Sequence, residues 1–321
     1  VWCWGQVPIF GNAHVREPRQ VPGVSNASAV AVGFTSTCAL VDTRAWCWGW
    51  NYDGSAGVPP TDTHDFRDKP IRVNIKEPLV ALAGGKGHAC ALTASGAVWC
   101  WGNNDEGEVG VTPKKRESHE PNDTRAPTHV SIPPSRAIAV GRAISCALAR
   151  DDDVVRCWGD LDIRGSSSSA RQVIVPPTVT LTKADDVAEI SNLKDVMAIV
   201  ASETQACVLQ RNAAPACWGT QIPIPGQKVT LRGQPDARTL HLYANLAGAT
   251  SIALAESRVC AIAGGKTRCF GWYRDLDSPT LAADIPGNFV QVAVGISEAC
   301  GLTATGELWC WWFPQRKMLD H

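Results

Sequence analysis

The chain has 321 residues, a formal net charge of −1 at pH 7 and a sequence pI near 6.7. This length suits two ordinary domains or one large repeat domain. The balanced charge excludes a global field that would draw the protein to nucleic acid or to an anionic membrane. Its apolar runs are strand-sized, well short of the roughly 20 residues that a membrane helix needs, so we expect no membrane insertion. The sequence begins at Val1 with no leader pattern, and we expect a processed export product whose signal lies upstream.

One unit, clearest at residues 83–110, recurs along the chain. Two runs of strand-forming residues, His88–Thr93 and Ala97–Trp101, flank the turn sequence Ala-Ser-Gly, which predicts a tight antiparallel hairpin. Cys90 and Cys100 lie on the two arms at similar distances from the turn. Cβ atoms of opposed residues in such a hairpin are about 4.5–5.5 Å apart, only slightly more than a disulfide requires. The unit therefore predicts a hairpin that a disulfide can cross-link.

The recurrence of this unit predicts a propeller. Successive copies of the second cysteine are 41 to 60 residues apart, and a period near fifty with strand–turn–strand content is typical of propeller blades. No long amphipathic stretch favours a helical repeat, although residues 184–197 are expected to form one short helix. The repeat hairpins lie near residues 2–5, 38–49, 90–102, 146–159, 207–219, 260–271 and 300–312.

Each complete hairpin is expected to follow a further strand, and several precede a fourth strand such as residues 71–73 or 128–130. Three to four strands per repeat is the content of a propeller blade. We therefore predict an all-β fold, a seven-bladed β-propeller over residues 1–321 as a single domain. One blade would be incomplete or closed by both chain ends. The expected first strands are 29–32, 80–83, 138–140, 196–200, 251–255 and 290–294.

Thirteen cysteines are present, and twelve of them form pairs that are nine to eleven positions apart. Zinc ligands are usually two to four residues apart, a spacing that does not occur here. We expect structural disulfides, with reduced thiols and a metal site as alternatives, and hence a secreted, periplasmic or cell-surface location. Cys3 is left unpaired, either because its partner was trimmed away or because it forms an intermolecular disulfide. The expected pairs are Cys38/Cys47, Cys90/Cys100, Cys146/Cys157, Cys207/Cys217, Cys260/Cys269 and Cys300/Cys310.

The repeat at residues 85–110, G-x-x-H-x-C-A-L-x-x-x-G-x-V-x-C-W-G-x-N-x-x-G-x-x-G, resembles that of the regulator of chromosome condensation family. Residues 33–57 keep the same pattern, and the later repeats keep part of it. The resemblance implies a seven-bladed propeller. The paired cysteines depart from nuclear members and are similar to exported bacterial members of the superfamily. Relatives include exchange factors for a small GTPase, chromatin-binding proteins and a secreted beta-lactamase inhibitor. No functional residue of theirs maps onto this chain, so the resemblance implies only a protein-binding ring.

No nucleophile, zinc or phosphate-loop motif occurs in the sequence. We therefore predict no enzyme, no cofactor, and no catalytic or metal-binding residue. His88 occupies a position that varies freely among the repeats, which favours a local blade element over a base or a ligand. The acidic turns at residues 51–54 and 151–153 lack the spaced oxygen ligands of a calcium loop, and we expect them to be solvated turns.

Tryptophans supply the candidate contact residues. Those of the Cys-Trp-Gly motifs are expected to pack between blades, with sugar stacking as the alternative; they are Trp4, Trp48, Trp101, Trp158 and Trp218. A second set recurs in only some repeats and is therefore a better candidate for binding, because tryptophan often anchors interfaces. Together with the basic run of one mixed-charge loop, the predicted binding surface is Trp46, Trp99, Trp309, Lys114, Lys115 and Arg116.

These observations favour a secreted or cell-surface propeller that binds another protein without catalysis. Its binding face would carry the uneven insertion loops, of which residues 103–129 and 160–187 are the most conspicuous. A carbohydrate-binding propeller is the first alternative, with a glycan as partner. The second is a structural subunit of an extracellular assembly or filament, self-assembled in part through Cys3.

Overall fold

A computed structural model describes residues 1–7, 13–62, 64–111, 124–160, 179–182, 187–190, 193–203, 205–219, 241–255, 258–271, 280–295 and 298–312. The chain divides into two compact units. Unit 1 comprises Val1–Asp160 and Thr180–Ser191, and unit 2 comprises Leu161–Val179 and Asn192–His321. Among the described residues the only helix is a one-turn 3-10 helix, Ala244–Leu246, and none is long and apolar enough to cross a membrane.

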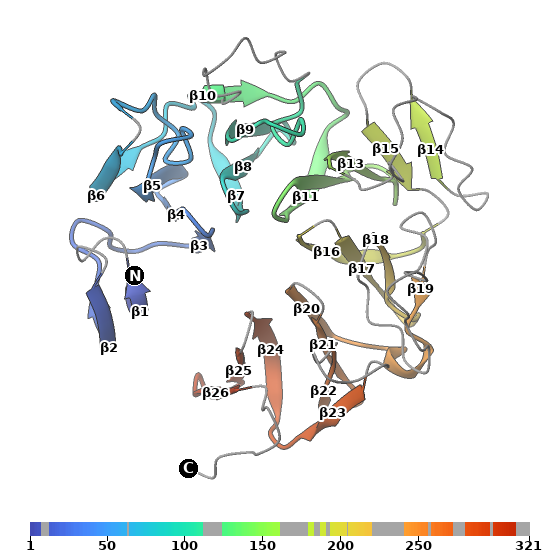
Figure 1. Ribbon diagram of the computed structural model, residues 1–321. Coiled ribbons are helices and arrows are strands. Elements are labelled where there is room, and N and C mark those ends of the chain that lie inside the picture. Colours follow the sequence, from blue (N-terminus) through green and yellow to red (C-terminus); the bar gives the residue numbers. More distant parts are fainter. Residues whose placement is uncertain are drawn as a thin grey trace. The chain divides into compact units, whose positions relative to one another are not determined.

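Unit 1 is built from small sheets whose strands follow one another in space as in sequence, except that β15 lies between β13 and β14 (Figure 1). The pair β1–β2 stands first, followed by the four-stranded sheets β3–β6 and β7–β10. The last sheet has the order β11-β12-β13-β15-β14. The strands are β1 Trp2–Val7, β2 Ala13–Gln20, β3 Ala29–Val32, β4 Ser36–Val41, β5 Arg44–Trp50, β6 Phe66–Arg72, β7 Leu79–Gly84, β8 His88–Thr93, β9 Val98–Gly102, β10 Thr124–His129, β11 Ser135–Val140, β12 Ile144–Ala149, β13 Val155–Gly159, β14 Val179–Thr182 and β15 Val187–Ile190.

Unit 2 repeats the same meander. It contains the four-stranded sheets β16–β19 and β20–β23 and the three-stranded sheet β24–β26 (Figure 1). The strands are β16 Val196–Ser202, β17 Gln205–Gln210, β18 Ala216–Gly219, β19 His241–Leu242, β20 Ser251–Ala255, β21 Arg258–Ala263, β22 Lys266–Gly271, β23 Thr280–Ile285, β24 Phe289–Val294, β25 Glu298–Thr303 and β26 Leu308–Trp312.

In three of the sheets the second strand is buried along its whole length. β8, β12 and β17 have every residue buried, and their sequences HACALT, ISCALA and QACVLQ are accordingly rich in small and branched apolar residues. The cores lie between successive sheets: one joins Cys38 and Cys47 to Trp101 of the next sheet, and another joins Cys90 and Cys100 to Trp158. First strands instead keep one partly exposed face.

Each complete hairpin carries a disulfide. In all six the two cysteines are direct cross-strand neighbours with Cα atoms 4.0–4.1 Å apart, the close spacing of a non-hydrogen-bonded antiparallel pair. The bonds join Cys38–Cys47, Cys90–Cys100, Cys146–Cys157, Cys207–Cys217, Cys260–Cys269 and Cys300–Cys310, the pairs that the sequence spacing predicts. Cys3 is a free, half-buried thiol.

The all-β prediction is confirmed, and so are the strands ahead of each hairpin. The helix expected over residues 184–197 is wrong where the chain is described, because β15 and the start of β16 lie there. β15 pairs antiparallel with β13, and Arg156 Nε lies 2.6 Å from Glu189 Oε1 across that pair. The ladder and this ion pair override a weak helical pattern. The count of seven blades, ring closure and the single-domain boundary stay predictions.

Candidate functional site: the loop end of unit 1

In unit 1 the turns between first and second strands lie side by side at one end of the sheets. The Phe34 N–H donates to Gly85 O at 3.1 Å, and the Thr35 N–H donates to Lys86 O at 3.1 Å. A Cβ atom on Gly85 would lie 2.1 Å from Gly141 O, so the next pair of turns approaches just as closely. We call residues 33–35, 51–58, 85–87, 104–111 and 141–143 the loop end.

The loops that leave third strands are shaped by one asparagine each. Asn51 Oδ1 accepts the Ala56 N–H at 2.9 Å, and its Nδ2 donates to Val58 O at 3.2 Å. Asn104 makes the equivalent bonds to the Val109 N–H and Val111 O at 3.0 and 3.1 Å. Because each amide binds two backbone groups of the loop that follows it, the loop closes on itself. One carbonyl of each loop stays free to accept a bond from elsewhere.

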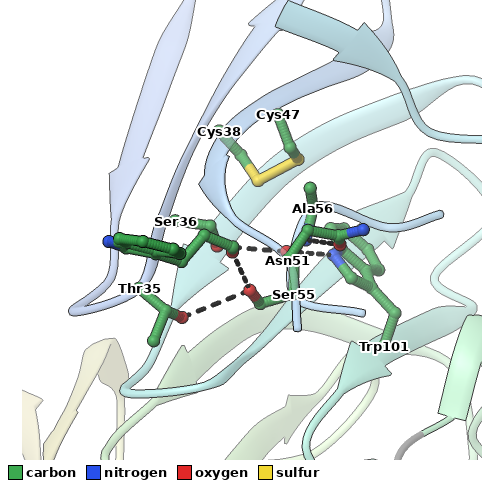
Figure 2. Close-up of a disulfide and its surroundings, with 9 residues drawn as sticks. Thr35, Ser36, Cys38, Cys47, Asn51, Ser55, Ala56 and Trp101 are labelled. Carbon is green, nitrogen blue, oxygen red and sulfur yellow. Dashed lines mark hydrogen bonds between the residues drawn. A yellow bond between two sulfur atoms is a disulfide. The ribbon is translucent and has the colours of Figure 1, made fainter. Parts of the chain in front are cut away.

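That carbonyl is held by the tryptophan of the following sheet. Ser55 O accepts from Trp101 Nε1 at 3.1 Å and from Ser36 Oγ at 3.0 Å (Figure 2). Glu108 O accepts from Trp158 Nε1 at 2.8 Å in the same way. We call each tryptophan-to-carbonyl bond a tryptophan latch. The latches join residues 46 and 50 positions apart, so they fix each loop against its neighbouring sheet.

His88 also joins two sheets. Its Nε2 lies 2.9 Å from Ser145 Oγ, whose hydroxyl donates to Glu108 O at 2.8 Å. The hydroxyl proton is therefore engaged, which makes the His88 Nε2–H the donor. Burial lowers the pKa of His88 to about 3, so the ring is neutral at neutral pH. A serine beside a histidine suggests hydrolase chemistry, but both side chains are buried. The pair acts as a cross-sheet tie, where the sequence predicted an element of a single blade.

Glu108 is the most perturbed carboxyl of the loop end. Burial raises its pKa to about 7, and the nearby charges of Asp105 and Glu106 add to this. Glu108 Oε2 accepts the Glu106 N–H at 2.9 Å, a bond that favours the charged form but does not offset the loss of solvation. The loop end therefore contains one carboxyl that titrates near physiological pH.

Over this fixed backbone the loop end exposes aromatic and basic side chains. Phe34 is 74% exposed and Tyr52 is 44% exposed. Lys86 is exposed with its Nζ 5.9 Å from the centroid of the Phe34 ring, within cation–π range, and Arg142 follows in the next turn. Aromatic residues and arginine are enriched at protein interfaces, so this surface has the composition of a contact site.

The predicted binding residues lie elsewhere. Trp46 and Trp99 are half-buried within β5 and β9, and the Trp99 ring packs edge-on against His129 at 5.4 Å. Trp309 is 56% exposed on β26 of unit 2. Lys114, Lys115 and Arg116 lie outside the described residues. Within unit 1, Trp46 and Trp99 belong to strands, away from the loop end.

The tryptophans of the Cys-Trp-Gly motifs behave as expected with one exception. Trp48, Trp101 and Trp158 are at most 1% exposed and Trp218 is 8% exposed, whereas Trp4 is 49% exposed. Trp4 differs because, in the part of the chain that the structure describes, its sheet contains only β1 and β2. The prediction of inter-blade packing is therefore wrong for Trp4 in this structure.

Sequence reasoning missed the exposed residues of the loop end. Phe34, Lys86 and Arg142 all occupy the fourth position before the first cysteine of their repeats, directly after a glycine. That constant glycine beside a variable residue was the available signal. Among the described residues no group of three or more His, Cys, Asp or Glu side chains could hold a metal ion, and Asn51 and Asn104 use their side chains to hold loops.

Comparison with known proteins agrees with this geometry. Family models named Regulator of chromosome condensation (RCC1) repeat match residues 79–108 and 95–148. The secretion-regulating guanine nucleotide exchange factor of Bos taurus is 32% identical over 126 residues, 37% of this chain and 26% of that protein. The X-linked retinitis pigmentosa GTPase regulator of Mus musculus is 26% identical over 114 residues, 35% of this chain and 11% of that protein. The chain thus spans about a quarter or less of these two relatives.

Solved structures show the fold. Prp20p of Saccharomyces cerevisiae superposes with a TM-score of 0.73 at 20% identity, over 97% of this chain and 80% of that one. The ectodomain of the Arabidopsis thaliana receptor kinase ACR4 gives 0.52 at 17% identity, over 89% and 79%. The fold is thus that of an all-β repeat propeller. Residues 79–148 are similar to regulator of chromosome condensation repeats, and the solved structures extend the likeness in fold to most of the chain.

Proposed function

We propose that this protein is a non-catalytic scaffold that binds another protein through the loop end, in an oxidising compartment. The observation that carries the proposal is the row of exposed Phe34, Lys86 and Arg142 side chains on turns fixed by hydrogen bonds between sheets. A rigid backbone loses little conformational entropy on binding, so contact energy of the side chains is retained as affinity. The two basic side chains favour an acidic partner surface.

The relatives support a protein partner. Prp20p is described together with its binding properties to Gsp1p and histones, and the bovine relative is named for nucleotide exchange. Six disulfides support an oxidising compartment, since disulfides are rare in reducing ones. The receptor kinase ectodomain is an instance of this fold outside the cell. The glycan alternative has less support, because Trp46 and Trp99 are half-buried.

Affinity capture with matched variants tests the proposal. The immobilised chain is incubated with an extract of its source, and captured proteins are quantified by mass spectrometry. The loop-end variant carries Phe34→Ser, Lys86→Glu and Arg142→Glu. The control carries the same types of change at exposed positions of unit 2: Leu242→Ser, Lys194→Glu and Arg211→Glu.

We expect the loop-end variant to lose at least about tenfold of its principal partner while the control retains it, in line with the ΔΔG of interface anchors. Equal capture by both variants would contradict the proposal. A third variant that lacks residues 112–123 distinguishes binding through the turns from binding through the insertion loop that the sequence analysis favoured. Loss of the partner from this variant alone would move the site to that loop.

A further inference from the structure

Glu108 combines, on one residue, a buried acidic side chain and the backbone carbonyl that two strands of the next sheet bind. Its carbonyl oxygen accepts from Trp158 Nε1 at 2.8 Å and from the Ser145 hydroxyl at 2.8 Å. Its side chain folds back into the loop of residues 104–111, where Oε2 accepts the Glu106 N–H at 2.9 Å. The tryptophan latch and the carboxyl are therefore attached to the same stretch of backbone.

The backbone of Glu108 has little freedom while the loop is closed. A Cβ atom on Gly159 would lie 3.3 Å from Glu108 Cα, so β13 packs directly against it, and Glu108 is only 3% exposed. Asn104 Oδ1 also holds the next amide, Val109 N–H, at 3.0 Å. Movement of the carboxyl into water therefore displaces the backbone that carries the latched carbonyl.

No positive charge compensates the carboxyl. Asp105 and Glu106 of the same loop add negative charge to its surroundings. Among the described residues, no ion pair includes Glu108. The elements packed against the loop bring three titratable or charged residues, which are His88 of β8, Arg142 of the turn before β12 and Asp160 directly after β13.

His88 cannot supply the missing charge. It reaches Glu108 only at the carbonyl and only through the Ser145 hydroxyl, and its ring is neutral at neutral pH. A carboxylate that is buried without a cation is strongly unfavourable, whereas the neutral acid is tolerated. Ionisation of Glu108 thus puts an uncompensated charge inside a closed loop.

The preceding loop has the same frame without a carboxyl at this position. Alignment of Asn51 with Asn104 places Ser55 opposite Glu108. Ser55 O accepts from Trp101 Nε1 at 3.1 Å, as Glu108 O does from its tryptophan (Figure 2). The Ser55 hydroxyl donates to Trp50 O at 2.6 Å within its own loop. The two loops therefore differ, at the latched residue, in one ionisable group.

We propose that the loop of residues 104–111 is a pH-operated latch, closed while the Glu108 carboxyl is neutral and opened when that carboxyl ionises. The charged carboxylate turns towards water and the backbone of residues 106–109 follows it. The bonds from Trp158 and Ser145 to Glu108 O then break. The loop of residues 51–58 stays closed, because Ser55 does not titrate. The inference concerns the loop itself and does not rest on the proposed function.

Linkage gives the size of the effect. The closed loop raises the pKa of Glu108 from 4.5 to about 7, and an open loop returns the carboxyl to water and to its ordinary pKa. Closure is therefore favoured at low pH, and this preference is lost as the pH rises through 7. For these two pKa values the equilibrium constant for opening should rise about tenfold between pH 6 and pH 8.5.

Hydrogen exchange of the intact chain, followed by mass spectrometry of short peptides, measures this opening. Each exchange rate is divided by the intrinsic rate at the same pH, which removes the base catalysis of exchange and leaves a protection factor. The reporters are Val109 and Gly110, whose N–H groups bind Asn104 Oδ1 and Gly107 O. Their matched controls in the preceding loop are Ala56 and Gly57, whose N–H groups bind Asn51 Oδ1 and Gly54 O.

We expect the protection factor of residues 109–110 to fall about tenfold between pH 6 and pH 8.5, while that of residues 56–57 changes by less than about twofold. This comparison needs no substitution, so it holds even if a variant fails to fold. Protection that does not change at residues 109–110, or that falls equally in both loops, would overturn the proposal.

Two variants then assign the titrating group. Glu108→Gln keeps the shape of the side chain without its charge, and residues 109–110 should be equally protected at both pH values. Glu106→Gln is the matched control, because it removes an exposed carboxyl from the same loop. It should retain a fall of at least about fivefold, since Glu108 stays ionisable. A fall that persists in Glu108→Gln, or that disappears in Glu106→Gln, would place the switch on another group and overturn the proposal.

Discussion

The two units use the same hairpin but hold its tryptophan differently. In unit 1, Trp101 and Trp158 donate to carbonyls of asparagine-shaped loops at 3.1 and 2.8 Å. Among the described residues of unit 2, the buried Nε1 atoms of Trp218 and Trp311 have no hydrogen-bond partner, and the sixth repeat has Phe270, which has no N–H to donate. The latch thus accompanies the Asn-x-x-Gly-x-x-Gly loop that follows a third strand.

This difference separates two roles of one side chain. All of these rings are largely buried and contribute hydrophobic area, so the ring is retained even where the described residues offer its N–H no partner. The hydrogen bond is an additional term that requires a loop of defined shape. We therefore expect unit 1 to resist unfolding more strongly than unit 2, and the following experiments test this from the largest expected effect to the smallest.

Reduction of the disulfides should have the largest effect. Each closes a loop of about ten residues and should stabilise by about 2–3 kcal/mol, which is large beside the roughly 5–15 kcal/mol of a typical domain. We expect reductant to lower the melting temperature by about 10 °C or more. Proteolysis of the reduced protein should cleave unit 2 before unit 1. Calorimetry and mass mapping of fragments measure both, and an unmoved melting temperature would show that the disulfides contribute nothing.

Gly110→Ala should come next. Gly110 has φ +82°, and an added Cβ would lie 2.7 Å from Val130 Cγ1 and 3.3 Å from Trp158 Nε1. We expect a loss of about 2–3 kcal/mol in the free energy of unfolding from backbone strain and overpacking together. Gly248 is the control, because it has φ +74° with nothing within 4 Å of the added atom. Gly248→Ala should lose only about 1 kcal/mol, and equal losses in urea denaturation would show that the latch contact is not strained.

Trp158→Phe compared with Trp218→Phe measures the latch itself. Both substitutions remove similar volume, but within the described part of the chain only Trp158 donates a hydrogen bond, to Glu108 O at 2.8 Å. The Trp158 variant should therefore lose about 1 kcal/mol more in the free energy of unfolding than the Trp218 variant. Indistinguishable losses would mean that the latch adds no stability beyond ring burial.

Glu108→Gln should have the most pH-dependent effect, and the smallest effect of the series at low pH. The folded-state pKa of Glu108 is raised from 4.5 to about 7, so its favourable contribution is complete below pH 4.5 and is lost as the pH rises through 7. The neutral amide removes this loss. We expect the variant to be more stable than the wild type at pH 8 by about 1–2 kcal/mol, with little difference at pH 4.5.

His88 has the opposite sign and serves as the internal check. Its folded-state pKa is lowered from 6.5 to about 3, so its contribution is present above pH 6.5 and is lost as the pH falls towards 3. Both the wild type and Glu108→Gln should therefore lose stability below pH 6. If the difference between the two proteins does not change between pH 4.5 and 8, the carboxyl of Glu108 is not perturbed.

The sequence by itself determined what is local. Cysteines nine to eleven positions apart on strand-forming arms place two sulfurs across one hairpin, and a short apolar run before each hairpin places the first strand. These features depend on the two-residue period of a strand and on turn length, and residues close together in the sequence determine both. The error at residues 184–197 arose because a short amphipathic segment does not specify whether a strand edge is available to it.

Only the tertiary structure decided the contacts between sheets. Trp158 donates a hydrogen bond to Glu108 O fifty residues away, and His88 is hydrogen-bonded to Ser145 fifty-seven residues away. Phe34 contacts Lys86 of the next turn. No local pattern specifies which carbonyl faces which ring, because this depends on how two sheets stack and how each loop closes. The exposed loop end follows from that stacking, since burial is decided by neighbours that lie a whole repeat away along the chain.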